Sequence, residues 1–256
     1  MRLVDGAEAI RGDLPSSATR VVDVPLEAGD SRNTGLARFG SLSLVKERTL
    51  AVLDELTDVA ITIGGDCGVD LAAIEHAMTR SNGDLAVVWF DAHPDLNTAE
   101  SSSTSAFTGM VLRTLLGDGV DGLVPATLLD PAKLVLAGTR SIDDSELEYM
   151  TAAGLAPVGV DALATPDALL AAVEATGASS VYIHIDVDIL DPADFSSKGD
   201  PVPFGITAAQ LTTLIRALRA RFALAGASIT EFAPASPDAA SDDLPTILRI
   251  IGSLTR

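Results

Sequence analysis

The sequence is poor in cysteine and in basic residues. Its single cysteine, Cys67, excludes an internal disulfide and fits a reducing compartment such as the cytoplasm. The 17 lysines and arginines are outnumbered by 36 aspartates and glutamates, giving a formal net charge of −19. Nucleic acids and anionic membrane surfaces are therefore poor partners, because both would be repelled. The same acidic balance is compatible with a cationic substrate.

Long apolar runs are also missing. No run approaches the roughly 20 residues that a membrane-spanning helix needs, and the N-terminus lacks the basic region and apolar core of a secretory signal. We therefore expect a cytoplasmic protein with no membrane partner. A mean hydropathy of +0.33 and 47% hydrophobic residues argue against disorder. The 256 residues suffice for one large domain, which we expect to span 1–256.

Short apolar stretches alternate with segments that have helical spacing. We expect strands at 19–25, 59–63, 85–90, 134–137, 156–160, 180–185 and 223–230, with helices between most of them. Such alternation predicts one α/β domain with a parallel sheet covered by helices on both faces. In a parallel sheet the carboxyl ends of the strands share one edge, and ligands bind at that edge.

One of these strand ends carries the motif DAHPD at 91–95. Asp91, His93 and Asp95 can converge on one point if the chain bends after the strand, and Pro94 favours that bend. Carboxylate and imidazole ligands together suit a divalent cation such as manganese or zinc. Taken alone, the motif is equally consistent with a strand followed by a polar turn.

A second pair of acids makes the metal interpretation stronger. Asp186 and Asp188 are two residues apart, so on an extended chain they share a face. Neighbouring carboxylates repel each other unless cations lie between them. Together with Asp91, His93 and Asp95 they are better explained by two divalent ions roughly 3.5–4 Å apart than by one ion.

Three motifs, in this order, resemble those of the ureohydrolases, the family of arginase and agmatinase. GGDC at 64–67 is similar to the family's GGDH, DAHPD at 91–95 to its DAHxD, and DVDILDP at 186–192 to its DxDxxDP. The resemblance implies a three-layer α/β/α fold around a mostly parallel eight-stranded sheet. It also implies a binuclear centre with two Mn²⁺ ions and a homo-oligomer, either a trimer or a hexamer.

The resemblance also implies roles for single residues. Asp91 and Asp186 would bridge both ions, and the full set of metal ligands would be Cys67, Asp91, His93, Asp95, Asp186 and Asp188. A metal-bridging hydroxide, held by Asp95, would attack the guanidinium carbon of a substrate oriented by Glu231. The expected enzyme is a hydrolase of linear C–N bonds in guanidine or amidine compounds. Arginine metabolism, with L-arginine converted to ornithine and urea, is the specific expectation; agmatine, guanidinobutyrate and formiminoglutamate are the alternative substrates.

Two further stretches resemble arginase more narrowly. Asp95-Leu96-Asn97-Thr98 is similar to its D-x-N-T motif, and GTRSIDDSE at 138–146 is similar to its GLRDVDPGE. By this resemblance Asn97 and Thr104 would contact the α-carboxylate of the substrate. Asp143 would bind its α-amino group, and Glu146 would be a second acidic contact. An α-amino acid substrate is therefore favoured.

Two residues depart from the family motifs. Cys67 replaces a histidine ligand, and a thiolate favours softer ions, so zinc or another divalent ion becomes an alternative to manganese. The competing interpretation is a buried thiol that binds no metal. Thr108 replaces the proton-shuttling histidine of the family's HGM motif. General acid–base groups contribute about 10²–10⁴-fold to rates, so turnover should be weakened by this threonine.

Other interpretations remain open. The chain could be a catalytically impaired relative that binds metal or an arginine-like ligand, and Cys67 and Thr108 favour this. A one-metal deacetylase on a related fold is disfavoured by the paired carboxylates. His184 alternates with Asp186 and can share its face. We favour a buried, hydrogen-bonded strand histidine at that position.

Overall fold

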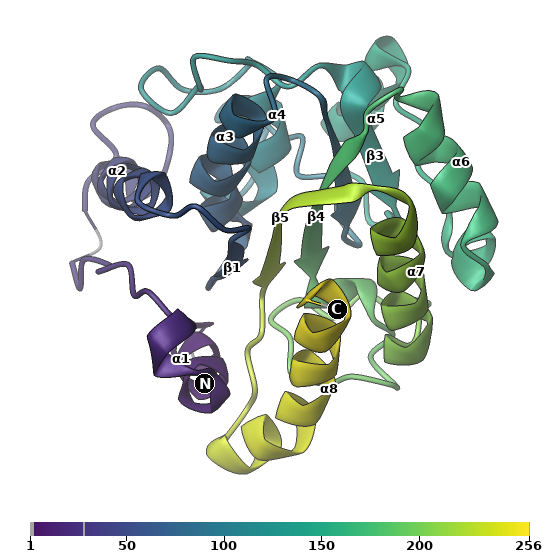
Figure 1. Ribbon diagram of the computed structural model, residues 1–256. Coiled ribbons are helices and arrows are strands. Elements are labelled where there is room, and N and C mark those ends of the chain that lie inside the picture. The colour runs from purple at the N-terminus through teal and green to yellow at the C-terminus, as the bar shows by residue number, and fades with distance from the viewer. Residues whose placement is uncertain (1–2, 28, 256) are drawn as a thin grey trace.

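The computed structural model describes residues 3–27 and 29–255, which are built around a parallel β-sheet (Figure 1). Within these residues the sheet has five strands in the order β1-β5-β4-β2-β3, and every neighbouring pair is parallel. The strands are β1 (Ile61–Ile63), β2 (Leu85–Phe90), β3 (Leu134–Ala137), β4 (Ser180–Asp186) and β5 (Ala223–Thr230). Their carboxyl ends therefore lie on one edge of the sheet.

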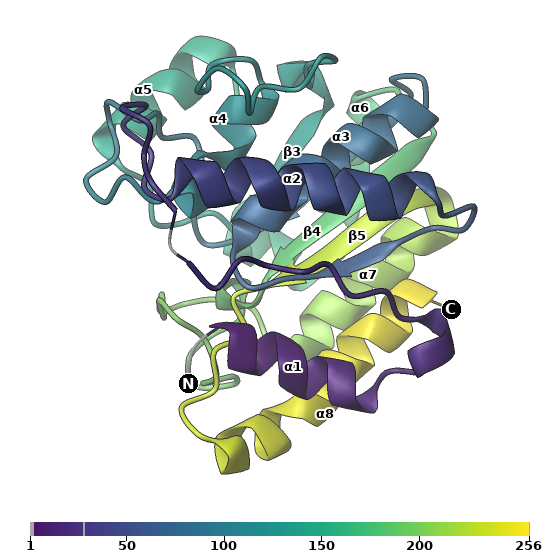
Figure 2. The same ribbon diagram turned by 90° about the vertical axis from the view of Figure 1, so that its left-hand side faces the viewer.

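Helices cover both faces of the sheet (Figures 1 and 2). One face packs against α1 (Leu3–Asp13), α6 (Asp167–Ala175), α7 (Ala208–Arg221) and α8 (Pro237–Thr255). The other packs against α2 (Phe39–Asp54), α3 (Asp70–Arg80), α4 (Val111–Leu115) and α5 (Asp144–Ala153). Strand β2 is buried along its whole length, with Val88 and Phe90 in the first core and Val87 and Trp89 in the second. The predicted three-layer α/β/α architecture is confirmed.

The expected number of eight strands is wrong for the part of the chain that the structure describes. The stretch 156–160 contributes only an isolated bridge between Ala137 and Val158. Pro157 has no N–H to donate and Gly159 has no side chain to pack, so a regular ladder does not form there. The stretch 19–25 is not a strand either, and Val21 and Val24 are exposed.

Capping residues mark some of the helix boundaries. Thr207 caps α7, and α8 begins at Pro237. Helix α1 forms although it contains two glycines, which are poor helix formers. Gly6 is required by packing, since a Cβ there would lie 1.8 Å from the carbonyl oxygen of Phe232.

The cap of α7 can be tested by a Thr207→Ala substitution. Thr207 Oγ1 accepts a hydrogen bond from Gln210 N at 3.2 Å, and Gln210 Oε1 accepts one from Thr207 N at 2.9 Å. Losing this capping box should lower the free energy of unfolding by about 0.5–2 kcal/mol, as measured by urea denaturation. Thr213→Ala, on the exposed side of the same helix, is the control. Equal effects of the two substitutions would contradict a capping role.

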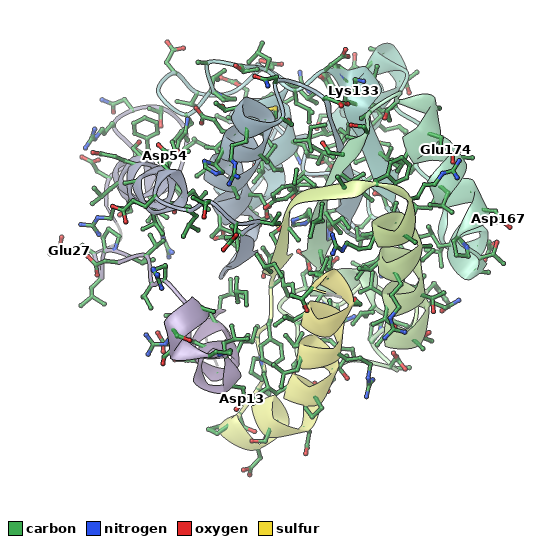
Figure 3. All side chains as sticks on the ribbon, in the orientation of Figure 1. Asp13, Glu27, Asp54, Lys133, Asp167 and Glu174 are labelled. Carbon is green, nitrogen blue, oxygen red and sulfur yellow. The ribbon has the colours of Figure 1, made fainter. Side chains whose placement is uncertain are left out.

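The acidic side chains fall into two groups. Many project from the outer layers, and Figure 3 labels Asp13, Glu27, Asp54, Asp167 and Glu174 among them, all exposed. Others are buried, and these are Asp70, Asp91, Asp95, Glu146, Asp186 and Asp188. Across residues 3–27 and 29–255, none of the helices has the length and apolar character needed to cross a membrane. The buried acids are unusual in a protein interior and lead to the candidate site.

Candidate metal centre

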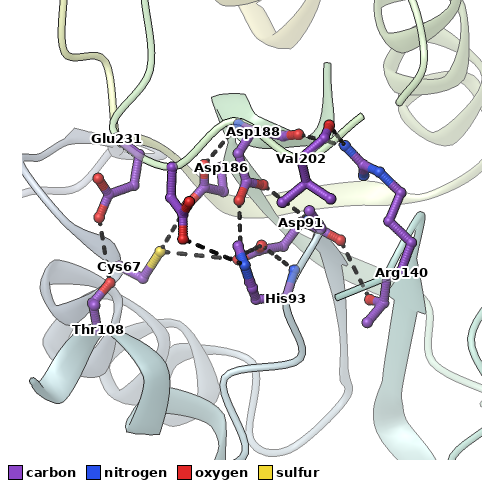
Figure 4. Close-up of polar contacts among 12 residues, drawn as sticks. Cys67, Asp91, His93, Thr108, Arg140, Asp186, Asp188, Val202 and Glu231 are labelled. Atoms are coloured by element: carbon purple, nitrogen blue, oxygen red, sulfur yellow. Dashed lines mark hydrogen bonds and ion pairs between the residues drawn. The ribbon is translucent and has the colours of Figure 1, made fainter. Parts of the chain in front are cut away.

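The candidate site lies at the carboxyl edge of the sheet, where several strand ends meet (Figure 4). Cys67 opens a short 3-10 helix after β1, and Asp91 directly follows β2. Asp186 is the last residue of β4, and Glu231 directly follows β5. The parallel topology therefore brings together residues that are far apart in the sequence, as the strand-end argument predicted.

Asp91, His93 and Asp188 form the first cluster. Nδ1 of His93 lies 2.8 Å from Asp188 Oδ2 and 3.5 Å from Asp91 Oδ1. Backbone amides hold the two carboxylates in place: His93 N donates to Asp91 Oδ1 at 2.6 Å, and Ala92 N donates to Asp188 Oδ1 at 2.9 Å. One ligand atom from each of these three residues lies within 4.8 Å of the others, which is close enough to share one cation.

Cys67, Asp186 and Glu231 form the second cluster. The Cys67 thiol donates to Asp186 Oδ2 at 3.2 Å and lies 4.0 Å from Asp91 Oδ2. On the outer side, Thr108 Oγ1 donates to Glu231 Oε1 at 3.4 Å. Cys67 and Thr108, the two departures from the family motifs, thus both lie within the group of residues that the sequence singled out.

Asp95 is buried beside these clusters in an unusual conformation. Its φ is +51°, a left-handed value that is rare outside glycine, and Glu231 has a similar φ of +62°. Oδ2 of Asp95 is buried, and among the residues that the structure describes it has no hydrogen-bond partner. A buried carboxylate oxygen without a partner is costly unless a cation satisfies it.

The protonation equilibria reflect this crowding of negative charge. Burial raises the pKa of Asp95, and the charge of Asp91 raises it further. Burial and the charges of Asp188 and Asp91 likewise raise the pKa of Asp186. Asp91 is the exception: burial would raise its pKa, but hydrogen bonds with His184 and His93 outweigh burial and hold it at about 2. The site thus places one readily ionised carboxylate, Asp91, beside carboxyl groups whose pKa values are raised.

Burial also raises the pKa of the Cys67 thiol, and the charges of Asp186 and Asp95 act in the same direction. A bound cation would reverse this effect, because it stabilises the thiolate. The donor set of carboxylate oxygens, imidazole nitrogens and one thiol, together with the unpartnered oxygen of Asp95, fits divalent cations. The arrangement can therefore hold metal.

Metal affinity should increase with pH. Burial and the charge of Asp91 raise the pKa of Asp188 to about 6. Burial would lower the pKa of His93, but hydrogen bonds with Asp188 and Asp91 outweigh burial and raise it to about 11. A cation binds the ionised carboxylate of Asp188 and the neutral imidazole of His93 and must displace their protons, so binding is weak below pH 6 and tightens towards pH 8. We expect up to about tenfold in affinity per pH unit for each proton displaced. Calorimetric titration with Mn²⁺ at pH 6, 7 and 8 measures this. An affinity that does not change with pH would contradict it.

The residues expected to contact the substrate are only partly brought together. Asn97 Nδ2 donates to Asp143 Oδ2 at 2.9 Å, and Asn97 Oδ1 accepts from Ser101 and Ser145. Glu146 is buried, and its two oxygens accept from the backbone amides of Leu96 and Asp143.

Thr104 is exposed, and its hydroxyl takes part in a local turn with Ser102 and Ala106. Asn97 and Asp143 thus form a pair, and Glu146 holds the two segments that carry them. The contact of Thr104 with the substrate stays a prediction.

The sequence did not predict which residues contact His184. It is fully buried, as predicted, and its Nε2 lies 3.5 Å from Asp91 Oδ2. Its Nδ1 lies 2.9 Å from Oδ2 of Asp70, at the start of α3, and its ring stacks on Trp89 with centroids 3.5 Å apart. The alternation of His184 with Asp186 was the available signal, whereas nothing in the sequence pointed to Asp70.

Arg140 stabilises the loop that follows Asp188. Its guanidinium donates to the carbonyl oxygens of Gly138, Asp188, Val202 and Pro203 at 2.8–3.1 Å. Figure 4 shows the contacts with Asp188 and Val202. Arg140 therefore ties Asp188 and the later segment at 202–203 to the chain that follows β3.

Comparison with known proteins places this architecture in a family. The family model described as "Arginase family" matches residues 10–248. The arginase of Entamoeba histolytica is 29% identical over 197 residues, which cover 72% of this chain and 64% of that protein. An N(omega)-hydroxy-L-arginine amidinohydrolase of Streptomyces lavendulae is 31% identical over 218 residues, covering 82% of this chain and 77% of that protein.

The fold of this chain is also similar to that of solved structures. The crystal structure of arginase from Bacillus subtilis strain 168 superposes with a TM-score of 0.83 at 22% identity, covering 98% of this chain and 90% of that one. The family match extends over nearly all of the described residues and includes every strand end that contributes to the site. The chain therefore belongs to the arginase family.

Proposed function

We propose that this protein is a metal-dependent hydrolase of a guanidine or amidine compound, with L-arginine, converted to ornithine and urea, as the first candidate substrate. The observation that carries the proposal is the pair of clusters formed by Asp91, His93 and Asp188 and by Cys67, Asp186 and Glu231. The buried Asp95 lies close enough for the charge of Asp91 to raise its pKa. The names of the relatives, arginase and amidinohydrolase, support the same reaction class.

In this proposal Asp91 and Asp186 are shared between two divalent ions. His93 and Asp188 complete one site, and Cys67 and Asp95 complete the other. Manganese is the typical ion of the family and zinc is the alternative, because the thiol of Cys67 favours softer ions. When bound, such ions lower the pKa of a coordinated water molecule and so supply the nucleophile.

Glu231 would bind the guanidinium group of the substrate. Burial and neighbouring acids raise its pKa to about 8, and a guanidinium placed against it favours the ionised form. The resulting charge-assisted hydrogen bond would orient the guanidinium carbon towards the metal centre. The positive φ of Glu231 and the hydrogen bond from its N–H to Gly65 O at 2.7 Å fix the backbone from which this side chain projects.

Asn97 and Asp143 would bind the far end of the substrate. Asp143 offers a carboxylate to an α-amino group, and Asn97 offers an amide to an α-carboxylate. Their mutual hydrogen bond at 2.9 Å supports a common site. An α-amino acid is therefore favoured over agmatine and guanidinobutyrate, which lack one of these two groups. N(omega)-hydroxy-L-arginine, the substrate named for the Streptomyces relative, belongs in the same test.

Metal analysis combined with a urea assay tests the proposal. Protein loaded with Mn²⁺ or Zn²⁺ is expected to contain two ions per chain and to release urea from L-arginine faster than from agmatine. Formiminoglutamate yields formamide and N(omega)-hydroxy-L-arginine yields hydroxyurea, so each of these two substrates needs its own product assay. If protein with two bound ions hydrolyses none of these compounds, the hydrolase proposal is wrong.

The second candidate function is binding of metal or an arginine-like ligand without efficient turnover. Thr108, which cannot shuttle protons near neutral pH, is the observation that favours it. This alternative predicts that L-arginine binds the metal-loaded protein in calorimetry while urea release stays at the level of the metal-free control.

A further inference from the structure

His184 lies against the part of the centre that contains Cys67. Its Nε2 is 3.9 Å from Cys67 Sγ and 3.5 Å from Asp91 Oδ2. One ligand atom from each of these three residues lies within 4.8 Å of the others, and all three residues are buried. His184 precedes Asp186 by two residues on β4, so both side chains leave the strand on the same face. The imidazole is thus directed into the centre from the sheet itself.

The other side of the ring is held by a buried carboxylate. Nδ1 of His184 lies 2.9 Å from Asp70 Oδ2 and 3.2 Å from Ser228 Oγ, and the other oxygen of Asp70 accepts from the Tyr182 hydroxyl at 2.7 Å. A carboxylate accepts hydrogen bonds, so Nδ1 carries the hydrogen and Nε2 is left to face Cys67 and Asp91. Stacking on Trp89 at an interplanar angle of 15° fixes the ring plane.

This arrangement is the one that metal-binding histidines use. Such a histidine binds the ion through one nitrogen, while the other donates to a carboxylate that sets the tautomer and orientation. Cys67 stands at the position where the family has a histidine ligand. The loop after β1 therefore carries no imidazole at that position. His184 brings an imidazole to the same place from β4.

We propose that His184 Nε2 is a ligand of the metal site built around Cys67, Asp91 and Asp186, and that Asp70 positions it. The assignment rests on the two-metal centre of the proposed function. His93 then serves one ion and His184 the other, so each of the two sites has one imidazole. The competing role for His184 is that of a charged partner of Asp91 that binds no metal.

Metal stoichiometry of purified variants separates these roles. The wild type is expected to hold two Zn²⁺ ions per chain, and His184→Gln is expected to hold one. The matched control is His76→Gln, because His76 pairs with Asp54 at 3.1 Å between α3 and α2 and should leave both ions bound. Adding Cys67→His to His184→Gln should restore the second ion, because it returns an imidazole to the loop. Two tightly bound ions in His184→Gln would overturn the assignment.

Asp70→Asn tests the positioning role. An asparagine keeps the shape of the side chain but weakens the acceptor for Nδ1. Removing a carboxylate behind a ligating histidine typically lowers metal affinity by about 10–100-fold. The loss should affect one of the two ions in a competition titration with a chelator. Unchanged affinity at both sites would exclude Asp70 from this role.

X-ray absorption of the wild-type protein with Zn²⁺ decides the matter even if His184→Gln does not fold. Scattering from imidazole rings should correspond to two rings per pair of ions if His184 binds, and to one ring if only His93 does. One ring per pair would overturn this inference and leave the proposed function intact. A wild type that binds no metal would overturn the proposed function, and the inference with it.

Discussion

Replacing Asp91 by asparagine is expected to remove metal from both sites and with it any hydrolytic activity. Its two oxygens face different neighbours: Oδ1 lies by His93, and Oδ2 lies by Cys67, His184 and the indole N–H of Trp89 at 3.1 Å. An asparagine loses the charge and turns an N–H₂ group towards one set of these neighbours. Substituting a residue that only hydrogen-bonds to a metal ligand lowers metal affinity by about 10–100-fold. Substituting the ligand Asp91 itself should therefore lower metal affinity by more than about 100-fold.

The measurement is metal content after dialysis, followed by urea release at saturating Mn²⁺. Asp58→Asn is the matched control, since Asp58 is exposed and precedes the amino end of β1, at the opposite edge of the sheet. The Asp58→Asn variant loses the same negative charge and should retain both ions. If Asp91→Asn kept two ions at unchanged affinity, Asp91 would not be a shared ligand, and the ligand assignment would have to be rebuilt.

A Thr108→His substitution is expected to raise kcat for L-arginine by about 10²–10⁴-fold, the usual contribution of a general acid–base group. The side chain at position 108 is well placed for this role, because Thr108 Oγ1 lies 3.4 Å from Glu231 Oε1. A histidine there would be next to the carboxylate proposed to hold the guanidinium group. It changes protonation near neutral pH, as a proton shuttle must.

Thr108→Gln is the control for size and hydrogen bonding, because glutamine resembles histidine in reach but cannot transfer protons in this range. The histidine variant should also show a new ionisation in its profile of kcat against pH, and the glutamine variant should not. Equal rates in the two variants would mean that a proton shuttle at position 108 does not limit turnover.

The fold could be predicted from the sequence where local signals were strong. The apolar run at 85–90 and the bounds of β3 and β5 agree with the structure, because strands buried on both faces need continuous apolar residues. The number of strands could not be predicted. At 156–160 the residues are apolar, but Pro157 prevents regular pairing, and an edge position depends on neighbours that a local pattern does not describe.

The site could be predicted as a set of strand ends but not as a network of contacts. Cys67, Asp91, Asp186 and Glu231 were found because parallel strands share a carboxyl edge. The contact between His184 and Asp70 joins residues 114 positions apart, and it depends on how α3 packs across β4. No periodicity within either segment encodes that packing. The expected contact of Thr104 with the α-carboxylate stays a prediction, because loop conformation decides where its hydroxyl points.

The stacked pair of Trp89 and His184 has a practical consequence. Trp89 is the sole tryptophan of the chain, and its indole N–H donates to Asp91. Fluorescence excited at the red edge of the absorption band therefore originates inside the centre. The emission depends on the imidazole against which the indole lies and on the carboxylate to which it donates. The protein thus carries a built-in optical reporter, through which events at this one edge of the sheet can be followed in solution without a label.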